Sequence, residues 1–413
     1  MSQPLTSDAT IVVVGASLAG MRAAEEIRHL GHTGEVVLIG DETHPPYDRP
    51  PLSKQFLAGK WDEERIHHHT PETLDAFGLE FRLGLRATRL DTDAHTLDCD
   101  DGSQVHYDGL IVATGARPRW LPGTEGMAGV RTLRTLDDSR GLRDDLTKLG
   151  EGARLVVIGA GFIGAEVAAT CHGLGADVTV VEALPTPLAG VIGQQMGEVC
   201  AGLHLDAGVA LRLGVGVDKV VPSPDGDGTP PLQVHLSDGS VLDADLVVVG
   251  IGVTPAVDWL EDSGLTLVNG VMCSDRLFAA DSVVAAGDVA RWTHVLLDED
   301  IRIEHWTNAA EGGALAAHNL IAGSAAAEPY TPVPFFWSDQ YQAKIQVLGR
   351  PDPEDEVVVV DGSGEDRKLV ALYRRGDRLS AALAISRPRQ LMAYRPLLAA
   401  AASFDEALEL SRL

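Results

Sequence analysis

The stretch IVVVGASLAG contains the first residues whose spacing indicates chemistry. An apolar strand there turns through Gly15 and Gly20 into a helix, with Ser17 at the middle glycine position. Glycines in such a turn let backbone N–H groups at a helix N-terminus approach a pyrophosphate, whose charge the helix dipole favours. We expect the small Ser17 to be tolerated, with backbone strain only if the site required φ > 0 there. Asp41, 21 residues after Gly20, ends the next strand and is placed to accept hydrogen bonds from a ribose diol.

A second turn matches the dinucleotide pattern completely. Gly159, Gly161 and Gly164 have the spacing G-x-G-x-x-G between an apolar strand and a helix, and the following strand, DVTVVE, ends at Glu182. One such motif is weak evidence, but two copies with strand, helix and acid in place predict two dinucleotide-binding units. Glu182 suits a ribose 2′-hydroxyl and repels a 2′-phosphate, and no Lys or Arg follows it in EALPTPLAG. We therefore expect NADH rather than NADPH at this turn.

Composition bounds the kind of protein. The chain has 413 residues, 44 glycines, 22 prolines and 45% hydrophobic residues, which fits a turn-rich α/β protein of two to three domains. A formal net charge of −27 argues against nucleic-acid binding. The apolar runs are only strand-length, and the polar opening MSQPLTSDAT leads directly into a strand. We therefore expect no membrane span, no leader and a cytoplasmic location.

Cysteine and histidine usage argues against thiol chemistry and against a metal site. The four cysteines lie far apart and form no C-x-x-C pair, so we expect no disulfide framework, thiolate metal site or redox-active dithiol. The run RIHHH at 65–69 is the only histidine cluster. Three consecutive side chains do not share one face of a helix or strand, so we expect a solvated or packing role and no metal.

Further motifs narrow the class. A strand ends in ATG at 113–115 and another in AAGD at 285–288, and PPYDRPPLSKQFLAG, LRTLDD, IEHWTNAAEGG and FFWSDQYQAKIQVLG complete the set. With these motifs the chain resembles the FAD-dependent ferredoxin reductases of bacterial oxygenase systems, the putidaredoxin, rubredoxin and biphenyl dioxygenase reductase group. The resemblance covers essentially the whole chain, and PPYDRPPLSKQFLAG is its most specific element.

The resemblance implies an α/β fold with two Rossmann-like dinucleotide-binding domains, one inserted in the other, and a C-terminal α+β domain. The residues agree in part, because 355–385 alternates apolar strands with Asp-Gly and Gly-Asp turns, which predicts a small antiparallel sheet. Residues 395–410 read as helices, and 328–336 as a linker. The implied domains are a discontinuous FAD-binding domain at 1–115 and 251–325, an NAD-binding domain at 116–250 and a C-terminal domain at 326–413.

The resemblance also implies site residues. Some follow from the glycine turns themselves, and others come from the resemblance alone. For FAD they are Gly15, Ser17, Ala19, Gly20, Asp41, Arg49, Lys54, Ala87, Thr114, Gly115, Arg134, Asp288 and Trp306. For NAD they are Gly159, Gly161, Ile163, Gly164, Glu182 and Gly252.

Two residues are expected to act in catalysis. By resemblance, Glu166 approaches the nicotinamide and pairs with Lys54, although the sequence leaves open that Glu166 is a first-turn acid placed for the helix dipole.

A helix beginning near Thr307, with Thr307 as a candidate N-cap, would direct its N-terminus near Trp306 at the pyrimidine end of the flavin. The alternative is that this segment is an ordinary capped surface helix with no role at the flavin, because the same sequence pattern would form one.

The implied function is electron transfer. The resemblance indicates an FAD enzyme that takes hydride from NADH and passes single electrons to a ferredoxin, of [2Fe–2S] or another type, that feeds a monooxygenase or dioxygenase. A thiol-dependent reductase is disfavoured, because GDETHPPYDRPPLSK contains no cysteine. The alternative of an NADH-sensing flavoprotein with a regulatory role stays open.

The stretch 374–395 contains six arginines and one acidic residue, Asp377. These arginines either dock an acidic ferredoxin or pair with neighbouring acids.

Overall fold

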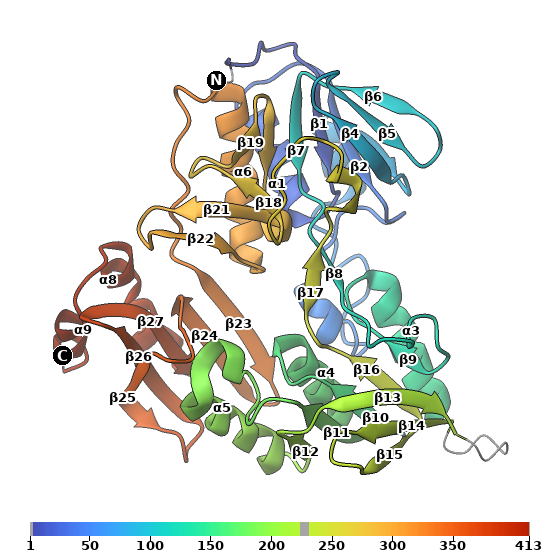
Figure 1. The fold of residues 1–413 in the computed structure, drawn as a ribbon, viewed down its shortest axis with the longest axis vertical. Coiled ribbons are helices and arrows are strands. Elements are labelled where there is room, and N and C mark those ends of the chain that lie inside the picture. The colour runs from blue at the N-terminus through green and yellow to red at the C-terminus, as the bar shows by residue number, and fades with distance from the viewer. Residues whose placement is uncertain (1–2, 224–230, 413) are drawn as a thin grey trace. The chain divides into compact units, whose positions relative to one another are not determined.

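The computed structural model describes residues 3–223 and 231–412, which fall into two compact units (Figure 1). Arg49–Asp62 and the C-terminal residues both belong to the second unit, so this division by contacts differs from the expected three domains, which stay a prediction. The first unit comprises Met1–Asp48, Glu63–Arg117 and Thr254–Pro334, and the second comprises Arg49–Asp62, Pro118–Val253 and Phe335–Leu413.

A six-stranded sheet forms the centre of the first unit. Its order is β19-β20-β7-β1-β2-β3, and neighbouring strands are parallel except β19 and β20. Strand β1 reads IVVV and is buried throughout, as expected for a parallel strand covered on both faces. The strands are β1 Ile11–Val14, β2 Val36–Gly40, β3 Glu80–Leu83, β7 Gly109–Val112, β19 Phe278–Ala280 and β20 Val283–Ala285.

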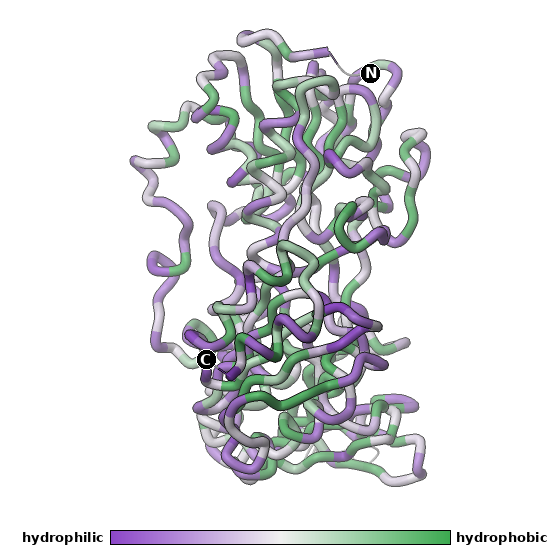
Figure 2. The backbone as a smooth tube through the Cα atoms, turned by 90° about the vertical axis from the view of Figure 1, so that its left-hand side faces the viewer, coloured by the Kyte–Doolittle hydropathy of each residue, from purple (hydrophilic) through white to green (hydrophobic). Residues whose placement is uncertain are grey.

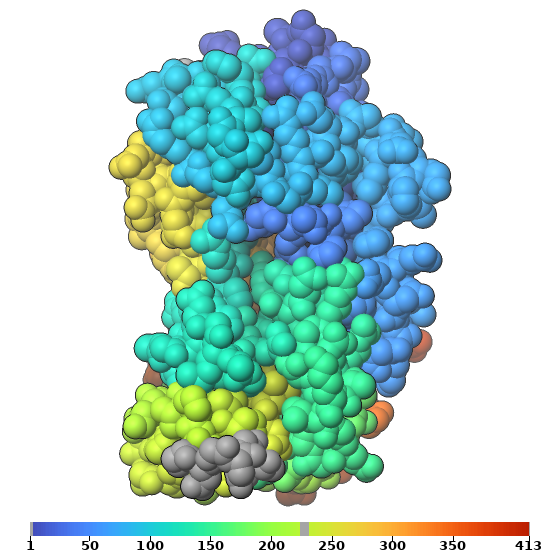
Figure 3. Space-filling model, turned by 90° about the vertical axis from the view of Figure 1, so that its right-hand side faces the viewer, coloured from blue at the N-terminus to red at the C-terminus, as the bar shows by residue number. Residues whose placement is uncertain are grey.

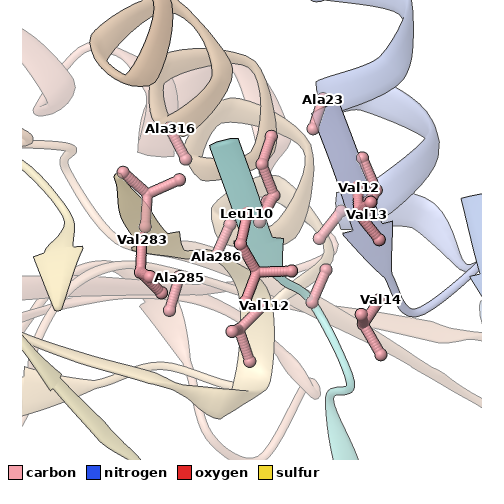
Figure 4. Close-up of a cluster of buried hydrophobic side chains, with 14 of the residues drawn as sticks. Val12, Val13, Val14, Ala23, Leu110, Val112, Val283, Ala285, Ala286 and Ala316 are labelled. Carbon is pink, nitrogen blue, oxygen red and sulfur yellow. The ribbon is translucent and has the colours of Figure 1, made fainter. Parts of the chain in front are cut away.

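Two helices, α1 (Leu18–His29) and α6 (Trp306–Ala322), pack closely against one another in this unit. Figure 4 shows Ala23 of α1 and Ala316 of α6 beside the buried side chains of β1, β7 and β20. Helix α6 has His305 as its N-cap, and its first turn is closed by the Ala309 N–H, which donates to the His305 carbonyl at 3.0 Å. The N-cap expected at Thr307 is therefore wrong by two residues.

The remaining elements of the first unit lie outside the six-stranded sheet. One three-stranded antiparallel sheet is formed by β4 Ala87–Asp91, β5 Thr96–Cys99 and β6 Gln104–His106. A three-stranded mixed sheet joins β18 Val271–Cys273, β21 Ala290–His294 and β22 Glu299–Arg302, with β18 parallel and β22 antiparallel to β21. The short helices are α2 Pro71–Ala76, η2 Asp258–Leu260 and η3 Gly287–Val289.

A parallel sheet of five strands organises the part of the second unit that contains the second glycine turn. Its order is β12-β11-β10-β16-β9, with the apolar β10 at its centre. The strands are β9 Val130–Arg131, β10 Arg154–Ile158, β11 Asp177–Glu182, β12 Ala210–Leu213 and β16 Leu246–Val249. The helices that accompany them are η1 Pro50–Ser53, α3 Leu136–Leu149, α4 Phe162–Gly173 and α5 Ala189–Asp206. The two βαβ units predicted from the glycine turns are therefore confirmed.

The C-terminal residues form an antiparallel sheet followed by helices, as the turn pattern predicted. The sheet order is β23-β24-β27-β26-β25, and β25, β26 and β27 span the stretch predicted as strands. The elements are β23 Phe335–Gln340, β24 Ala343–Gly349, β25 Glu356–Ser363, β26 Lys368–Arg375, β27 Arg378–Ile385, α7 Pro388–Met392, α8 Arg395–Ala399 and α9 Phe404–Leu410.

A small antiparallel sheet of β13 (Val217–Pro222), β14 (Leu232–Leu236) and β15 (Val241–Ala244) lies at the surface on the face drawn in Figure 3, where it is yellow-green. Strands β8 (Ala116–Pro118) and β17 (Val253–Pro255) lie where the chain passes between units.

Figure 2 shows hydrophobic and hydrophilic residues interspersed along the backbone. Among residues 3–223 and 231–412, no helix is long and apolar enough to cross a membrane.

Candidate nucleotide-binding and redox site

The second glycine turn has no room for side chains at two of its three glycines. Gly159 has φ +96°, and a Cβ there would lie 2.4 Å from the Gly250 carbonyl oxygen. A Cβ at Gly164 would lie 2.1 Å from the Gly159 carbonyl oxygen, because the helix begins directly against the turn. These two glycines are therefore required by the backbone, whatever binds there.

Gly161 is different, because its missing side chain would meet no protein atom within 4 Å. It is the N-cap of α4 and borders a cavity of about 460 Å³ at the carboxyl ends of β10, β11 and β16. This open space at a helix N-terminus fits the close approach of a pyrophosphate. The cavity is lined by Leu121, Ile158, Gly159, Gly161, Val181, Glu182, Ala183, Val215, Gly216, Val217, Gly250, Ile251 and Gly252.

Glu182 is the only charged residue in that lining. Its carboxylate accepts hydrogen bonds from the Ala160 N–H at 2.7 Å and the Leu184 N–H at 2.9 Å, so the backbone fixes its position at the rim of the turn. The arrangement leaves acceptor capacity for a ribose diol and offers no cation for a 2′-phosphate.

The structure brings together most of the expected NAD residues. Gly159, Gly161, Glu182 and Gly252 line the cavity, whereas Gly164 packs under the turn and Ile163, 47% exposed, lies outside the lining. Sequence reasoning missed the apolar lining residues. The rule that ligands bind at the carboxyl ends of parallel strands would have found Ile158, Val181 and Ile251. Leu121, Val215 and Gly216 come from connections and Val217 from the start of β13, and neither place carries such a signal.

The first glycine turn repeats the backbone geometry of the second. Gly15 has φ +118°, and a Cβ there would lie 2.1 Å from the Ala113 carbonyl oxygen. A Cβ at Gly20 would lie 1.9 Å from the Gly15 carbonyl oxygen. Ser17 is the N-cap of α1 with φ −116°, an extended conformation open to any residue, so the strain considered for it does not arise. These residues fit a bound pyrophosphate as the NAD turn does.

Other expected FAD residues of the first unit gather near this turn. Thr114 follows β7, and its hydroxyl donates to the Ala256 carbonyl at 2.9 Å. A Cβ at Gly287 would lie 3.0 Å from the Ala19 Cβ, which places the η3 turn and its Asp288 beside the start of α1. Gly115, with φ +67°, accepts from the Ala256 N–H. Asp41 is exposed directly after β2, and Ala87 is buried at the start of β4.

Trp306 is held at the N-terminus of α6 by a residue that sequence reasoning did not single out. Its indole N–H donates to the Asp48 carboxylate at 2.7 Å. Asp48 is in turn fixed by its own N–H, which donates to the Ile66 carbonyl, while the His68 N–H donates to the Pro46 carbonyl. The histidine run therefore has a structural role, holding the segment before Arg49. Among the described residues, no cluster of His, Cys, Asp or Glu could hold a metal ion.

Lys54 and Glu166 form a buried ion pair within the second unit. The Lys54 ammonium nitrogen lies 2.7 Å from Glu166 Oε2, and the two side chains are 11% and 3% exposed. Glu166 lies in the second turn of α4 and is not exposed to solvent, so the alternative of a first-turn acid placed for the dipole is wrong. The short helix η1, which Lys54 directly follows, is fixed because the Ser139 hydroxyl donates to the Leu52 carbonyl and the Thr170 hydroxyl to the Ser53 carbonyl, both at 2.7 Å.

Arg49 and Arg134 also meet within the second unit. The Arg49 guanidinium donates to the Arg134 carbonyl at 2.7 Å. The Arg134 N–H donates to the Asp138 carboxylate at 2.9 Å, at the N-terminus of α3 where Thr135 and Asp138 form a capping box. The Arg49 and Lys54 side chains and the Arg134 backbone are thus fixed by contacts in this unit.

The four cysteines are buried free thiols. Burial raises the pKa of Cys171, Cys200 and Cys273 to about 12 and also raises that of Cys99. A thiol that does not ionise near neutral pH is a poor nucleophile and a poor partner in thiol–disulfide exchange. None of the four is suited to a redox role.

The arginine-rich stretch 374–395 is largely neutralised by neighbouring acids. Arg375 pairs with Asp355 at 2.8 Å, Arg374 with Glu356 and Asp377 at 3.7 and 3.8 Å, and Arg387 with Asp361 at 3.5 Å. These acids lie before or on β25 and on the β26–β27 turn. The alternative of ordinary pairing is therefore confirmed for three of the six arginines, and less positive charge is left for a partner than the sequence suggested.

Comparison with known proteins identifies the family. Residues 9–313 match the pyridine nucleotide-disulphide oxidoreductase family, and residues 335–410 match the reductase C-terminal family. The chain belongs to the pyridine nucleotide-disulphide oxidoreductases. Within that family it is similar to rhodocoxin reductase of Rhodococcus erythropolis, with 36% identity over 94% of this chain and 89% of the relative.

Two further relatives point to the same group of family members. The ferredoxin–NAD(+) reductase component of the anthranilate 1,2-dioxygenase system of Burkholderia cepacia is 35% identical over 95% of both chains. The reductase in the covalent putidaredoxin reductase–putidaredoxin complex matches with a TM-score of 0.89 and 33% identity, over 96% of this chain and 94% of that one. The predicted fold class and the resemblance to ferredoxin reductases are therefore confirmed.

Proposed function

We propose that the chain is an FAD-dependent NADH:ferredoxin oxidoreductase, which takes hydride from NADH and passes single electrons to a small ferredoxin that feeds a monooxygenase or dioxygenase. One observation carries the proposal. Helix α4 begins at the NAD cavity with Gly161 and, in its second turn, presents Glu166 to the buried Lys54. One helix thus links the nucleotide cavity to a fixed cation.

The assignment of cofactors to the two turns follows from their chemistry. The turn at Gly15 and Gly20 holds the FAD pyrophosphate, and Asp41 holds its ribose. Thr114, Asp288 and the N-terminus of α6 complete the site in the first unit. For Arg49, Lys54 and Arg134, which belong to the second unit, a role at FAD is implied by the resemblance alone. When bound, FAD accepts two electrons together and releases them singly, which is what a two-electron donor and a one-electron acceptor require.

The chain's own groups contribute binding, orientation and charge. Glu182 accepts from the ribose hydroxyls of NADH, and the N–H groups at the start of α4 face its pyrophosphate. Glu166 holds the Lys54 ammonium group in a fixed position within the second unit. The N-terminus of α6, fixed through Trp306 and Asp48, favours negative charge arriving there.

Two alternatives are less well supported. A thiol-dependent reductase needs an ionisable cysteine, and the four present are buried. A regulatory NADH sensor has no support among the relatives, which are named as reductases or as reductase components of oxygenase systems. The division into domains at 1–115 with 251–325, 116–250 and 326–413, and the cytoplasmic location, are parts of the proposal.

The partner is a small acidic iron–sulfur protein, of [2Fe–2S] or another type. A similar reductase has been captured covalently with putidaredoxin, which supports a protein electron acceptor here. Within the stretch 374–395, Arg378 and Arg389 are the candidates for docking, since Arg374, Arg375 and Arg387 are paired.

The decisive experiment is anaerobic stopped-flow reduction of the purified FAD-loaded protein, followed at the flavin band, with NADH and with NADPH. The reduced protein is then mixed with ferricyanide or with a [2Fe–2S] ferredoxin. Fast bleaching by NADH only, with reoxidation by both acceptors, is expected. Equally fast bleaching by NADPH would overturn the role given to Glu182. Slow bleaching with no electron delivery to either acceptor would overturn the reductase function itself.

A further inference from the structure

The buried carboxylate of Glu166 accepts hydrogen bonds from two separate segments of the chain. Its Oε2 accepts from the Ser53 hydroxyl at 2.5 Å and from the Lys54 ammonium group at 2.7 Å. Its Oε1 accepts from the Ser338 hydroxyl at 2.9 Å and from the Asp339 N–H at 3.2 Å. Ser53 and Lys54 belong to the segment at η1, whereas Ser338 and Asp339 belong to strand β23 of the C-terminal sheet.

We propose that Ser338 is a positioning residue for the Lys54–Glu166 pair, so that strand β23 of the C-terminal sheet sets the orientation of the cation. The inference rests on the proposed function for the meaning of Lys54. It concerns a contact outside the nucleotide-binding motifs, made 172 residues along the chain from Glu166.

The first argument is saturation of the carboxylate. Two carboxylate oxygens offer about four acceptor sites, and four donors fill them. Glu166 is 2% exposed, Ser53 2% and Ser338 0%, so water cannot easily replace a lost donor. With both oxygens fully bonded, Glu166 serves to hold Lys54 rather than to bind a ligand. Lys54 makes one hydrogen bond within the described part of the chain, which leaves two ammonium N–H groups for a cofactor.

The second argument is that the Ser338 hydroxyl is itself oriented. It accepts a hydrogen bond from the Gln340 side-chain nitrogen at 3.3 Å, which directs its own proton toward Glu166. Gln340 is also completely buried, and its carboxamide oxygen has no hydrogen-bond partner among the described residues. A buried polar group is costly without its hydrogen bonds, so the bond from the Gln340 nitrogen to Ser338 helps to fix both side chains.

Removing the hydroxyl would loosen the ion pair. In Ser338→Ala, Oε1 keeps only the longer bond from the Asp339 N–H, and the carboxylate is free to turn about its side-chain bonds. Lys54 would then lose its fixed direction. Loss of one hydrogen bond to a charged group changes an equilibrium by about tenfold.

The test uses the oxidised holoenzyme and acetylation of lysines by acetic anhydride, with mass spectrometry as the readout. Lys60 is exposed and close in sequence, so it serves as the internal reference. We expect Lys54, relative to Lys60, to be acetylated about tenfold faster in Ser338→Ala than in the unmodified protein. We expect Ser338→Thr, which keeps the hydroxyl, to restore protection. Gln340→Met should have a smaller effect of about twofold.

Ser263→Ala is the matched control. Ser263 is a buried serine of the first unit whose hydroxyl donates to the Leu260 carbonyl at 2.6 Å and accepts from the Leu265 N–H, so it too has one donated and one accepted bond. Its loss should leave Lys54 protected. In rapid kinetics, Ser338→Ala should lower the limiting rate of flavin reduction by about tenfold without changing the dissociation constant for NADH.

Unchanged Lys54 protection in Ser338→Ala would overturn the inference, and so would an unchanged limiting rate of reduction. If Ser338→Ala does not fold, the comparison of Ser338→Thr with Gln340→Met decides, and equal Lys54 reactivity in those two proteins overturns it. A protein that NADH does not reduce would instead refute the proposed function, while the labelling would still report on the contact.

Discussion

The two glycine turns share a backbone but differ in the groups that project from it. In both, the first glycine lies against a carbonyl of the neighbouring strand's end, and the last lies against the carbonyl of the first. The differences are at three places: Ser17 against Gly161, the position of the acid, and the residue two places after the last glycine. The shared features make a pyrophosphate site, and the different ones decide what each site does.

The acids of the two turns are not structural equivalents. In β1 and β2, Val14 pairs with Ile39, and in β10 and β11, Ile158 pairs with Val181. The counterpart of Glu182 in the first turn is therefore Gly40, and Asp41 lies one residue further on. A Cβ at Gly40 would lie 2.6 Å from the Ala16 Cβ, so this position excludes a side chain. Asp41, the acid of the first turn, is exposed to solvent, whereas the carboxylate of Glu182 in the second turn is bonded to two backbone N–H groups.

The residue two places after the last glycine shows the largest difference. Arg22 in the first turn has a side chain that is 43% exposed and pairs with Glu25 in the same helix. Glu166 in the second is buried and accepts from four donors on distant segments. The same position in two copies of one motif is thus a surface residue in one and the centre of a polar network in the other.

Adding one carbon atom at Gly164 should destabilise the fold, whereas adding one at Gly161 should not. Gly164→Ala places a Cβ 2.1 Å from a backbone oxygen, so we expect a loss of stability of about 3 kcal/mol or more. Gly161→Ala meets no protein atom and should leave the melting temperature unchanged, while weakening NADH binding about tenfold by filling the space for the pyrophosphate. Thermal unfolding and NADH titration measure the two effects. Unimpaired NADH binding by Gly161→Ala would show that the nucleotide does not approach there.

Neutralising the residue two places after the last glycine tests the second difference. Glu166→Gln leaves Lys54 without its charged partner in a buried site, so we expect a stability loss of about 3 kcal/mol and slow flavin reduction. Arg22→Gln breaks a surface pair worth at most about 1 kcal/mol and should change neither property much. Chemical denaturation and stopped-flow reduction by NADH check both. Equal destabilisation by the two substitutions would mean that burial of Glu166 does not matter as argued.

Removing the charge of Glu182 should alter coenzyme choice. Glu182→Gln weakens the hydrogen bonds to the ribose, so we expect NADH to bind about tenfold more weakly, with little change for NADPH. Preference for NADH should therefore fall by about the same factor. The measurement is kcat/KM for both coenzymes with ferricyanide as acceptor, and Asp41→Asn is the control in the other turn. A preserved NADH preference in Glu182→Gln would locate discrimination elsewhere.

Local patterns in the sequence were sufficient for the glycine turns, the βαβ units and the C-terminal sheet, because each is determined by residues close together in the chain. The register in which the strands pair cannot be predicted from the sequence. For this reason the sequence alone does not show that Gly40, rather than Asp41, is the counterpart of Glu182. The donors to Glu166 come from residues 112 and more positions away, and no local pattern indicates them. Likewise the stretch 374–395 contains no acid for Arg387, because its partner, Asp361, lies on β25.

Exchanging the middle residues of the two turns gives the smallest and most specific effect. Ser17 is an N-cap in an ordinary extended conformation, and serine and glycine differ at an N-cap by only about 0.3 kcal/mol. Ser17→Gly should therefore keep FAD content and stability nearly unchanged. Gly161→Ser has the same chemistry in reverse, but its side chain enters the nucleotide cavity, so it should reduce NADH affinity while retaining FAD. Flavin content and NADH titration on the two proteins distinguish these outcomes. If both exchanges were neutral for their nucleotides, the middle position would not separate the two turns, and the difference would rest on the acids and on Glu166.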